Sequence, residues 1–566
     1  MNQFTQDIAE VIHDQIPDLT EEEIDQLLEI PPNIDMGDYA FPCFTLAKQF
    51  RKNPVAIAQE LSEKIAVKGA ILRVANAGPY LNFFLDKGVL ARQVMGEIWE
   101  KRERYGSAQI GDGKRIVIDY SSPNIAKPFG IAHLRTTVIG NALCKIYEFL
   151  GYKVIRVNHL GDWGTQFGKQ IVAYKKWGDE ELIKQNPIRQ LYDLYVRFHV
   201  EAENDPSLEE EARLWFKRLE DGDKEARQLW QWFRDLSLEE FQRIYTLLDI
   251  GFDSYDGESF YNEMINDTIE RIKEKGLTTV SQDALIIPLD QYNLPPCLLK
   301  KRDDATLYAT RDICAAEYHY RTYEFEKKLY VVAAHQKLHF QQIFKVLELM
   351  EYPWANRCVH VEFGMMNFKG GKMSTRKGNI IVLEEVLSRA IELSEEIIEE
   401  KNPDLADKKG VAKDVGIGAV IFTDLSSKRV KDVTFDWDEV LNFDGETGPY
   451  LQYTHARISS VLRKYGRPVE RDIDCSLLTT REELLLVKTL ERFPQVVLRG
   501  TENYEPSMIS NYLLELAGIF NKFYNGYRIL SEDEMLTKAR IFLSDSVRQT
   551  LYNGLTLLGI KAPEEM

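Results

Sequence analysis

The feature that most limits the fold is a strand–loop–helix–strand pattern in the first third of the chain. KRIVIDYSS (114–122) is a β-rich run, HLRTTVIGNALCKIYEFLG (133–151) is apolar at helical spacing and ends at a glycine, and the strand-like YKVIRV follows. Two strands joined through a helix run parallel, and the crossover is right-handed in nearly all proteins. The pattern therefore predicts the first half of a nucleotide-binding α/β sheet.

Further predicted domains surround this unit. Residues 171–285 are mostly amphipathic helix, as in EARQLWQWFRDLSLEEFQRIYTLL, and indicate a helical insertion. From about Ala284 the runs DALIIPL, ATLYATRD and KKLYVVAAH predict that the sheet resumes, as the second half of a Rossmann-like, doubly wound parallel sheet requires. We therefore expect an α+β N-terminal domain over 1–108, the α/β domain over 109–440 and an all-α bundle over 441–566.

Composition narrows the class of protein. The 566 residues exceed what one hydrophobic core supports. No apolar run approaches the roughly 20 residues of a membrane helix, and the polar start MNQFTQDIAEVIHDQ has no secretory pattern, so we expect a cytoplasmic protein. The six cysteines are scattered without C-x-x-C spacing, which predicts neither zinc nor disulfides. With a net charge of −18, any RNA partner must meet a locally basic surface.

A loop after the first predicted strand combines small residues with positive charge. In SSPNIAKPFGIAHLR, the side chains of Lys127, His133 and Arg135 stand near the start of the following helix. Backbone N–H groups at a helix start stabilise phosphate, so the loop is a candidate nucleotide site. The alternative is an ordinary turn between strand and helix with a histidine at the surface.

A second segment, GGKMSTRKGN (370–379), places Lys372, Arg376 and Lys377 between glycines, so that it could close on a triphosphate. The alternative is a flexible basic surface loop. Together, the two segments resemble the HIGH and KMSKS signatures of class I aminoacyl-tRNA synthetases. The pair is specific, whereas either segment alone is weak.

Four more strings resemble one member of that class, the arginyl-tRNA synthetases: IDYSSPNIAKP, VNHLGDWGTQFG, ATLYATRD and FDGETGPYLQYTHARI. The resemblance extends to GDYAFPCFTLAK and NAGPYLNFF near the amino terminus and to the ending LLGIKAPEEM. It therefore runs essentially from end to end. It implies a D-loop-reading N-terminal domain and an anticodon-binding C-terminal bundle.

The resemblance also implies an activity, the ATP-dependent joining of arginine to tRNA in protein synthesis. Arginine's carboxylate would attack the α-phosphorus of ATP, with Mg²⁺ as the companion of the leaving pyrophosphate. The 2′-hydroxyl of the terminal ribose of the tRNA would then accept the arginyl group. The family usually needs bound tRNA for the first step and is commonly monomeric, so a monomer is expected.

Matching the family's motifs implies which residues hold arginine and ATP. Arginine would be held by Asp119, Asn124, Tyr308, Asp312 and Gln336. Asp312 is the first choice for the guanidinium, which needs a carboxylate at fork geometry; its alternative is a helix-initiating cap in TRDICAAEY. ATP would lie among Gly130, Ile131, Ala132, His133, Met373 and Ser374, and the catalytic cations would be Lys127, His133, Lys372, Arg376 and Lys377.

Four residues are implied in tRNA binding. In the N-terminal domain, Tyr80 and Asn82 match an aromatic and an amide that could stack on and hydrogen-bond an unpaired base. In the helical bundle, Tyr450 and Tyr453 match aromatic positions near the anticodon. A tyrosine and an asparagine in a core strand are the alternative for the first pair, and Tyr453 could equally belong to a core.

The sequence departs from the family's pattern at two places. The four HIGH positions read Gly130, Ile131, Ala132 and His133, so that the first histidine and the glycine are replaced. Losing one donor to developing charge costs roughly 10²–10³ in rate in comparable sites. KRDDAT carries Asp304 where the family commonly has glycine. A non-catalytic regulator that binds arginine or tRNA is therefore the alternative hypothesis, and an unrelated nucleotidyltransferase a distant third.

Overall fold

The computed structural model describes residues 3–31, 34–300, 308–368, 381–443 and 445–566, which form two compact units. Unit 1 comprises Met1–Tyr105, Ile458–Phe493 and Glu515–Leu551, and unit 2 comprises Gly106–Arg457, Pro494–Leu514 and Tyr552–Met566. The helices of the C-terminal region are thus shared between the units. The domain boundaries at 108/109 and 440/441 stay a prediction.

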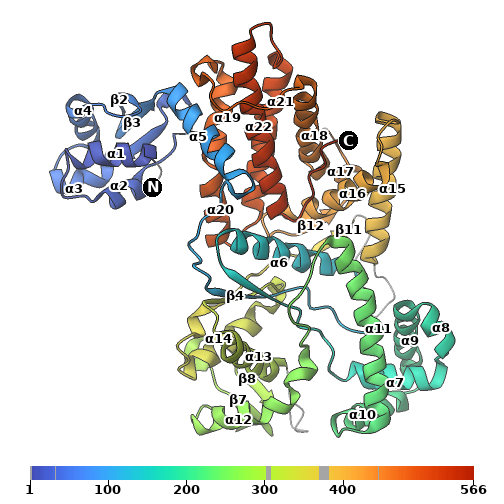
Figure 1. The fold of residues 1–566 in the computed structure, drawn as a ribbon. Coiled ribbons are helices and arrows are strands. Elements are labelled where there is room, and N and C mark those ends of the chain that lie inside the picture. Colours follow the sequence, from blue (N-terminus) through green and yellow to red (C-terminus); the bar gives the residue numbers. More distant parts are fainter. Residues whose placement is uncertain (1–2, 32–33, 301–307, 369–380, 444) are drawn as a thin grey trace. The chain divides into compact units, whose positions relative to one another are not determined.

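Unit 2 is built on a parallel four-stranded sheet in the order β10-β9-β4-β5, of which β4 is labelled in Figure 1. The predicted strand–helix–strand unit is confirmed as β4 (Arg115–Asp119), α6 (Ala132–Phe149) and β5 (Lys153–Val157). The second half adds β9 (Lys327–Tyr330) and β10 (Cys358–His360) on the other side of β4. The strand order therefore reverses between β4 and β9, and ligands of such sheets bind at the carboxyl ends of the strands at this point.

The sheet resumes later than expected. DALIIPL forms β7 (Ala284–Ile287), which lies in a separate antiparallel sheet between β6 (Thr279–Ser281) and β8 (Cys297–Lys300). In ATLYATRD, the described residues begin helix α13 (Tyr308–Tyr323). The expectation of a sheet strand at Ala284 was wrong because a short apolar run does not reveal which sheet will bury it.

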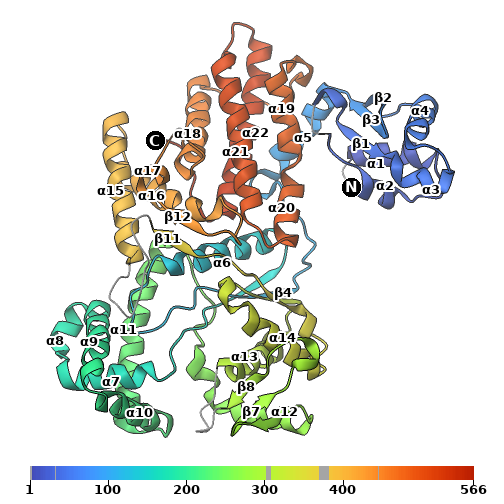
Figure 2. The same ribbon diagram turned by 180° about the vertical axis from the view of Figure 1, so that it is seen from behind.

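The predicted helical insertion is a group of helices after β5. It contains α7 (Gln166–Trp177), α8 (Glu180–Gln185), α9 (Pro187–Asn204), α10 (Ser207–Glu220) and α11 (Lys224–Leu248). Figures 1 and 2 show α7 to α10 gathered at one end of the long helix α11. Residues after α11 form η4 (Glu258–Met264) and α12 (Ile265–Glu274), which lead back towards the sheet.

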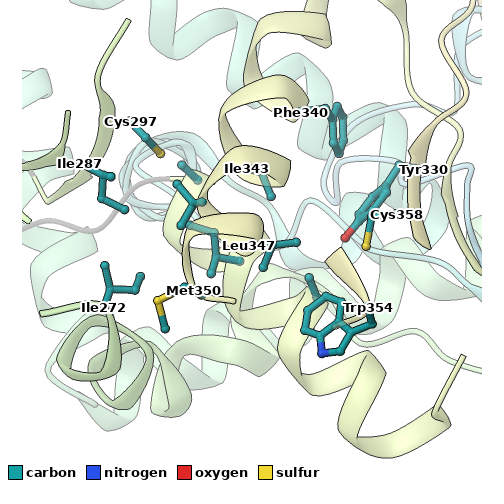
Figure 3. Close-up of a cluster of buried hydrophobic side chains, with 14 of the residues drawn as sticks. Ile272, Ile287, Cys297, Tyr330, Phe340, Ile343, Leu347, Met350, Trp354 and Cys358 are labelled. Carbon is teal, nitrogen blue, oxygen red and sulfur yellow. The ribbon is translucent and has the colours of Figure 1, made fainter. Parts of the chain in front are cut away.

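A large apolar cluster covers one face of the sheet (Figure 3). Helix α14 (Lys337–Leu349) contributes Ile343 and Leu347, which pack in the same cluster as Tyr330 of β9 and Cys358 of β10. Helix α13 also joins this cluster through Ile313 and other buried residues. Because α13 and α14 are packed on the sheet, their polar residues are held at fixed positions beside its carboxyl edge.

Unit 1 contains the expected α+β segment. Its antiparallel sheet has the order β1-β3-β2, from β1 (Tyr39–Pro42), β3 (Tyr80–Leu85) and β2 (Ile71–Ala77). Helices α1 (Gln3–His13), α2 (Glu21–Leu27), α4 (Pro54–Lys64) and α5 (Lys87–Lys101) accompany it. Helix α19 (Arg481–Glu491), which begins with a capping box at Thr480, joins the same unit through an ion pair of 2.7 Å between Lys488 and Asp38.

The C-terminal region is helical, as expected. Its main helices are α18 (Gly448–Tyr465), α20 (Phe493–Glu502), α21 (Ser507–Gly526) and α22 (Glu534–Leu557), and no strand occurs in the described residues after 441. Two further helices of unit 2 precede them, α15 (Leu383–Lys401) and α16 (Lys408–Leu425). Every helix in the described part of the chain is too short or too polar to cross a membrane.

All six cysteines are buried as free thiols: Cys43, Cys144, Cys297, Cys314, Cys358 and Cys475. Burial raises the pKa of each thiol, to about 12 for Cys43, Cys144 and Cys297. The thiolate is the reactive form of cysteine, so these side chains are held in their unreactive state.

Candidate active site

Asp119 lies at the end of β4, at the point where the strand order reverses. The side chain is buried and accepts a hydrogen bond of 3.3 Å from the hydroxyl of Ser122. Burial raises the pKa of Asp119, while the nearby His159 and Lys328 act in the opposite direction. A buried carboxyl group with charged neighbours at this edge of the sheet is a candidate for binding a charged ligand.

Asp312 lies in the second turn of α13, and its carboxylate faces two histidines. His339 Nε2 is 2.6 Å from one carboxylate oxygen, and His159 Nε2 is 3.9 Å from the other. Burial alone would raise the pKa of Asp312, but the hydrogen bond from His339 and the charges around it hold that pKa below its usual value. Since α13 begins at Tyr308, Asp312 is not the helix-initiating cap.

Glu258 is a third acidic residue, and the sequence reasoning missed it. One carboxyl oxygen is buried with no hydrogen-bond partner in the described structure. Burial raises its pKa to about 8, against the attraction of Arg311 and with added repulsion from Asp312 and Asp162. The sequence analysis assigns GESFY to the acidic helical insertion. Composition alone does not reveal that Glu258 within it is shielded from solvent.

The HIGH-like segment pairs with the chain that leaves the basic segment 370–379. Gly130 and Val382 form an antiparallel bridge. The Ile131 N–H donates to the Ile381 carbonyl at 2.9 Å, and the Leu383 N–H donates to the Phe129 carbonyl at 2.9 Å. The structure therefore brings the first motif beside the residues that directly follow the second.

The residues of the HIGH-like segment differ in exposure to solvent. Ile131 is buried and Ala132, the first residue of α6, is exposed. His133 is partly buried, and its Nδ1 accepts a hydrogen bond of 3.2 Å from the Gly130 N–H. Burial, together with the charge of Lys127, lowers the pKa of His133 to about 4, so the ring is neutral at neutral pH. A neutral ring donates a single N–H, here from Nε2.

Lys127 and Arg135, expected beside His133, occupy different surroundings. Lys127 Nζ lies 5.0 Å from the centre of the Tyr195 ring, on a helix of the insertion. Arg135 is fully buried, pairs with Asp424 at 3.4 Å and donates to the Arg429 carbonyl at 3.0 Å. The expectation that Arg135 faces phosphate was wrong, because two residues along a helix turn a side chain by about 200°.

The loop between β4 and α6 is held in an unusual backbone shape. Ser121, Ser122 and Ala126 have φ angles of 70°, 48° and 58°. Left-handed backbone costs roughly 1–2 kcal/mol per residue without glycine. It is offset here by hydrogen bonds, among them Ser121 Oγ to the Tyr245 hydroxyl at 2.7 Å. Asn124 bridges to Gly161, where any side chain would collide with its carboxamide.

Two of the remaining expected arginine ligands, Tyr308 and Gln336, are exposed. Tyr308 is exposed and precedes Asp312 by one helical turn, so both stand on one face of α13. Gln336 is exposed and ends the short turn before α14, the helix that carries His339. Lys372, Met373, Ser374, Arg376, Lys377 and Asp304 lie outside the described residues.

The four expected tRNA contacts differ in exposure. In unit 1, Tyr80 is half-buried against Phe44, with ring centres 5.9 Å apart, whereas Asn82 is only 3% exposed. In unit 2, Tyr450 is partly buried, and Tyr453 is exposed with Arg457 packed 4.8 Å from its ring centre. Burial disfavours a direct contact for Asn82, and the tRNA roles of all four stay predictions.

Family models match three parts of the chain: the N-terminal domain of arginyl tRNA synthetase over residues 2–85, the catalytic domain of class I (R) tRNA synthetases over 95–437, and the DALR anticodon binding domain over 451–566. Two arginine–tRNA ligases, from Halothermothrix orenii and Clostridioides difficile, are each 52% identical to the chain; the first alignment covers all of both chains, and the second spans 566 residues. The solved arginyl-tRNA synthetase of Thermus thermophilus has a TM-score of 0.84 and 25% identity, covering all of both chains. The chain therefore belongs to the arginyl-tRNA synthetase family of class I aminoacyl-tRNA synthetases.

Proposed function

We infer that this protein activates arginine with ATP and transfers it to the 3′ end of tRNA. The observation that carries this function is a group of shielded carboxyl groups near the switch point of the sheet, in which Asp312 acts electrostatically on both Asp119 and Glu258. A planar cation with five donors is the ligand that such a group of carboxylates selects. Relatives that match the whole length are named as ligases, which favours catalysis over the non-catalytic alternative.

We propose that Asp312 holds the guanidinium and that Glu258 adds a second carboxylate. Asp312 suits the first role because His339 orients its carboxylate while leaving it ionised. Glu258 has a buried oxygen that lacks a partner in the described structure, and a guanidinium N–H would satisfy it. Asp119, Asn124, Tyr308 and Gln336 would complete the pocket.

We propose that ATP lies along Gly130, Ile131, Ala132 and His133. Ala132 is exposed and begins α6, so the positive end of that helix supports phosphate binding here, whereas the N–H groups of Gly130, Ile131 and His133 already donate within the protein. The backbone pairing with 381–383 supports a role for the adjoining residues Lys372, Met373, Ser374, Arg376 and Lys377 in closing on ATP. Mg²⁺ would enter with ATP, as the ion of that substrate.

We propose that tRNA contacts Tyr80 in unit 1, and Tyr450 and Tyr453 in unit 2, whereas Asn82 is too buried to take part directly. A small cavity of about 150 Å³ supports the assignment of Tyr453, because Phe443 and Met566 line it beside this tyrosine. Aromatic and apolar walls with a nearby arginine suit a splayed base. A monomer in the cytoplasm completes the proposal.

The direct test is transfer of labelled arginine to purified tRNA with ATP and Mg²⁺. We expect the protein to charge tRNA, and a Gly130→His/Ala132→Gly double variant to charge it faster. If only the double variant charges tRNA, the altered motif has disabled catalysis. Arginine or tRNA binding without charging by either protein would establish the non-catalytic alternative.

A further inference from the structure

A lysine is buried beneath the arginine pocket, on the central strand β9. Lys328 is fully shielded from solvent. Its register partner on β4 is Val117, and Tyr330 two residues later pairs with Asp119. Side chains two residues apart on a strand share a face. Lys328, Tyr330 and Asp119 therefore occupy one face of the sheet, the face that α13 covers.

Lys328 makes a hydrogen bond that fixes the form of a buried histidine. Its Nζ lies 2.6 Å from Nδ1 of His319 on α13, and Nε2 of His319 lies 3.0 Å from the Tyr261 hydroxyl. While Lys328 is protonated, its ammonium group only donates, so Nδ1 accepts and the ring proton stands on Nε2. His319 therefore donates to Tyr261, and the lysine determines the direction of both hydrogen bonds.

The relay continues to the pocket. The Tyr261 ring stacks on His159 with centres 5.6 Å apart, and His159 Nε2 faces Asp312 at 3.9 Å. The ring of Tyr261 is itself buried, so its position depends on its neighbours. A change at Lys328 is thus transmitted through two rings to the histidine beside the expected guanidinium ligand.

The charge of Lys328 acts on the same carboxylates. Its Nζ lies 4.3 Å from the centre of the Tyr330 ring; burial lowers the pKa of Lys328, while the charges of Asp119 and Asp312 act to raise it. Burying an uncompensated charge costs several kcal/mol, so lysine and carboxylates depend on one another.

We propose that Lys328 is a positioning residue for arginine, which acts through the His319–Tyr261–His159 relay and through its charge on Asp119 and Asp312. This inference rests on the proposed function and deepens it. It assigns arginine recognition to a residue that does not touch the substrate. Replacing Lys328 would weaken arginine binding while leaving ATP binding unchanged.

The test compares Lys328→Met with Lys327→Met, a matched control one residue away. Lys327 points to the opposite face of β9 and bonds the Tyr504 hydroxyl at 3.0 Å. We expect Lys328→Met to raise KM for arginine about tenfold at pH 6.5, since an opposite charge shifts a carboxylate pKa by about one unit or more. KM for ATP and all constants of Lys327→Met should match the original protein.

The pH profile separates positioning from a structural role. Asp119 is faced by His159, Lys328, Asp312, Tyr261 and Ser122. Losing Lys328 removes a group that lowers the pKa of Asp119, so the acidic limb of kcat/KM for arginine should move to higher pH. Tyr261→Phe breaks the relay but keeps the ammonium, so KM for arginine should rise without that movement.

An unchanged KM for arginine in folded Lys328→Met would overturn the proposal. If that variant does not fold, Tyr261→Phe decides, and an unaltered arginine KM there has the same meaning. Calorimetric titration of each variant with arginine distinguishes a failure of the proposed function from a failure of the role proposed for Lys328. Failure of the original protein to charge tRNA would contradict the proposed function, whereas equal arginine affinity in all variants would contradict only the role of Lys328.

Discussion

The carboxylates of the pocket have different charges at the same pH. Hydrogen bonding to His339 keeps Asp312 ionised, whereas burial leaves Glu258 largely protonated at pH 7, with a pKa of about 8. A protonated carboxyl group near an ionised one avoids the repulsion that two charges would suffer. The proposed arginine site would therefore accept a cation without holding its full negative charge in advance.

Asp312→Asn tests the ionised partner. The substitution leaves a guanidinium without its opposite charge, which costs about 2–5 kcal/mol when such pairs are buried. KM for arginine should rise at least about 30-fold, with little change in KM for ATP, in charging assays. Asp290→Asn, at an exposed aspartate, is the control. Equal effects of both substitutions on arginine would contradict the assignment.

The raised pKa of Glu258 predicts that arginine binding is coupled to the release of a proton. Arginine favours the carboxylate, so binding at pH 7 should release a proton, and affinity should rise with pH until about pH 8, where Glu258 is ionised beforehand. Calorimetry in two buffers of different ionisation enthalpy measures this release. In Glu258→Gln the release should disappear, and its persistence would show that another group supplies the proton.

Some candidate residues of the site are predictable from the sequence and others are not, for a physical reason. Asp312 is a candidate through the motif match alone, since the sequence leaves the cap interpretation equally open, and its role stays a prediction. Glu258 was missed and Arg135 misplaced, because burial and helical facing depend on the neighbours that pack against them. Composition and spacing do not contain those neighbours.

At the scale of elements, residues 129–131 of the HIGH-like segment pair with residues 381–383. The contact is made by backbone groups, so it does not depend on the residues replaced at Gly130 and Ala132. This explains how the site can keep its arrangement despite the altered motif. One hydrogen bond of this pairing can also be removed by a substitution at its donor residue, Leu383, which leaves the HIGH-like segment unchanged.

Leu383 allows that experiment. It is the first residue of α15, where proline is tolerated, and the preceding Val382 is already extended. Leu383→Pro removes the N–H that bonds Phe129, whereas Leu383→Ala keeps it, and both lose the buried side chain. We expect KM for ATP to be about two- to tenfold higher in the proline variant. Identical values would show that the pairing does not serve ATP.

The elements themselves were largely predictable. The change from β-rich runs to helical periodicity gave β4, α6 and β5 close to their observed limits. The run at Ala284 was placed in the wrong sheet, since partners far along the chain decide which strands pair. The local sequence pattern therefore indicates whether a segment is a helix or a strand, whereas long-range packing decides which sheet a strand joins.

At the scale of the whole molecule, the charge of −18 opposes a polyanionic partner. Binding of tRNA must therefore rely on local cations such as Arg457, which packs on Tyr453. Phosphate contacts release counterions, so KM for tRNA should rise steeply with salt, while KM for arginine at saturating tRNA should change little. Charging assays between 50 and 200 mM salt measure both. A flat response for tRNA would exclude a phosphate-based interface.

The division into two compact units was not predictable from periodicity. Helical spacing identifies which face of α18 to α22 is apolar, but not which other face it meets. The sharing of these helices between both units is a property of packing alone.

Because every native thiol is buried, fluorescent dyes can be attached selectively to cysteines introduced at the surface. A cysteine introduced at an exposed position would ionise near its ordinary pKa and react with a maleimide dye far faster than the six native thiols. Two such positions, one in each compact unit, would carry a donor and an acceptor dye without prior removal of native cysteines. Energy transfer between them would then follow, in real time, how the units respond when tRNA arrives.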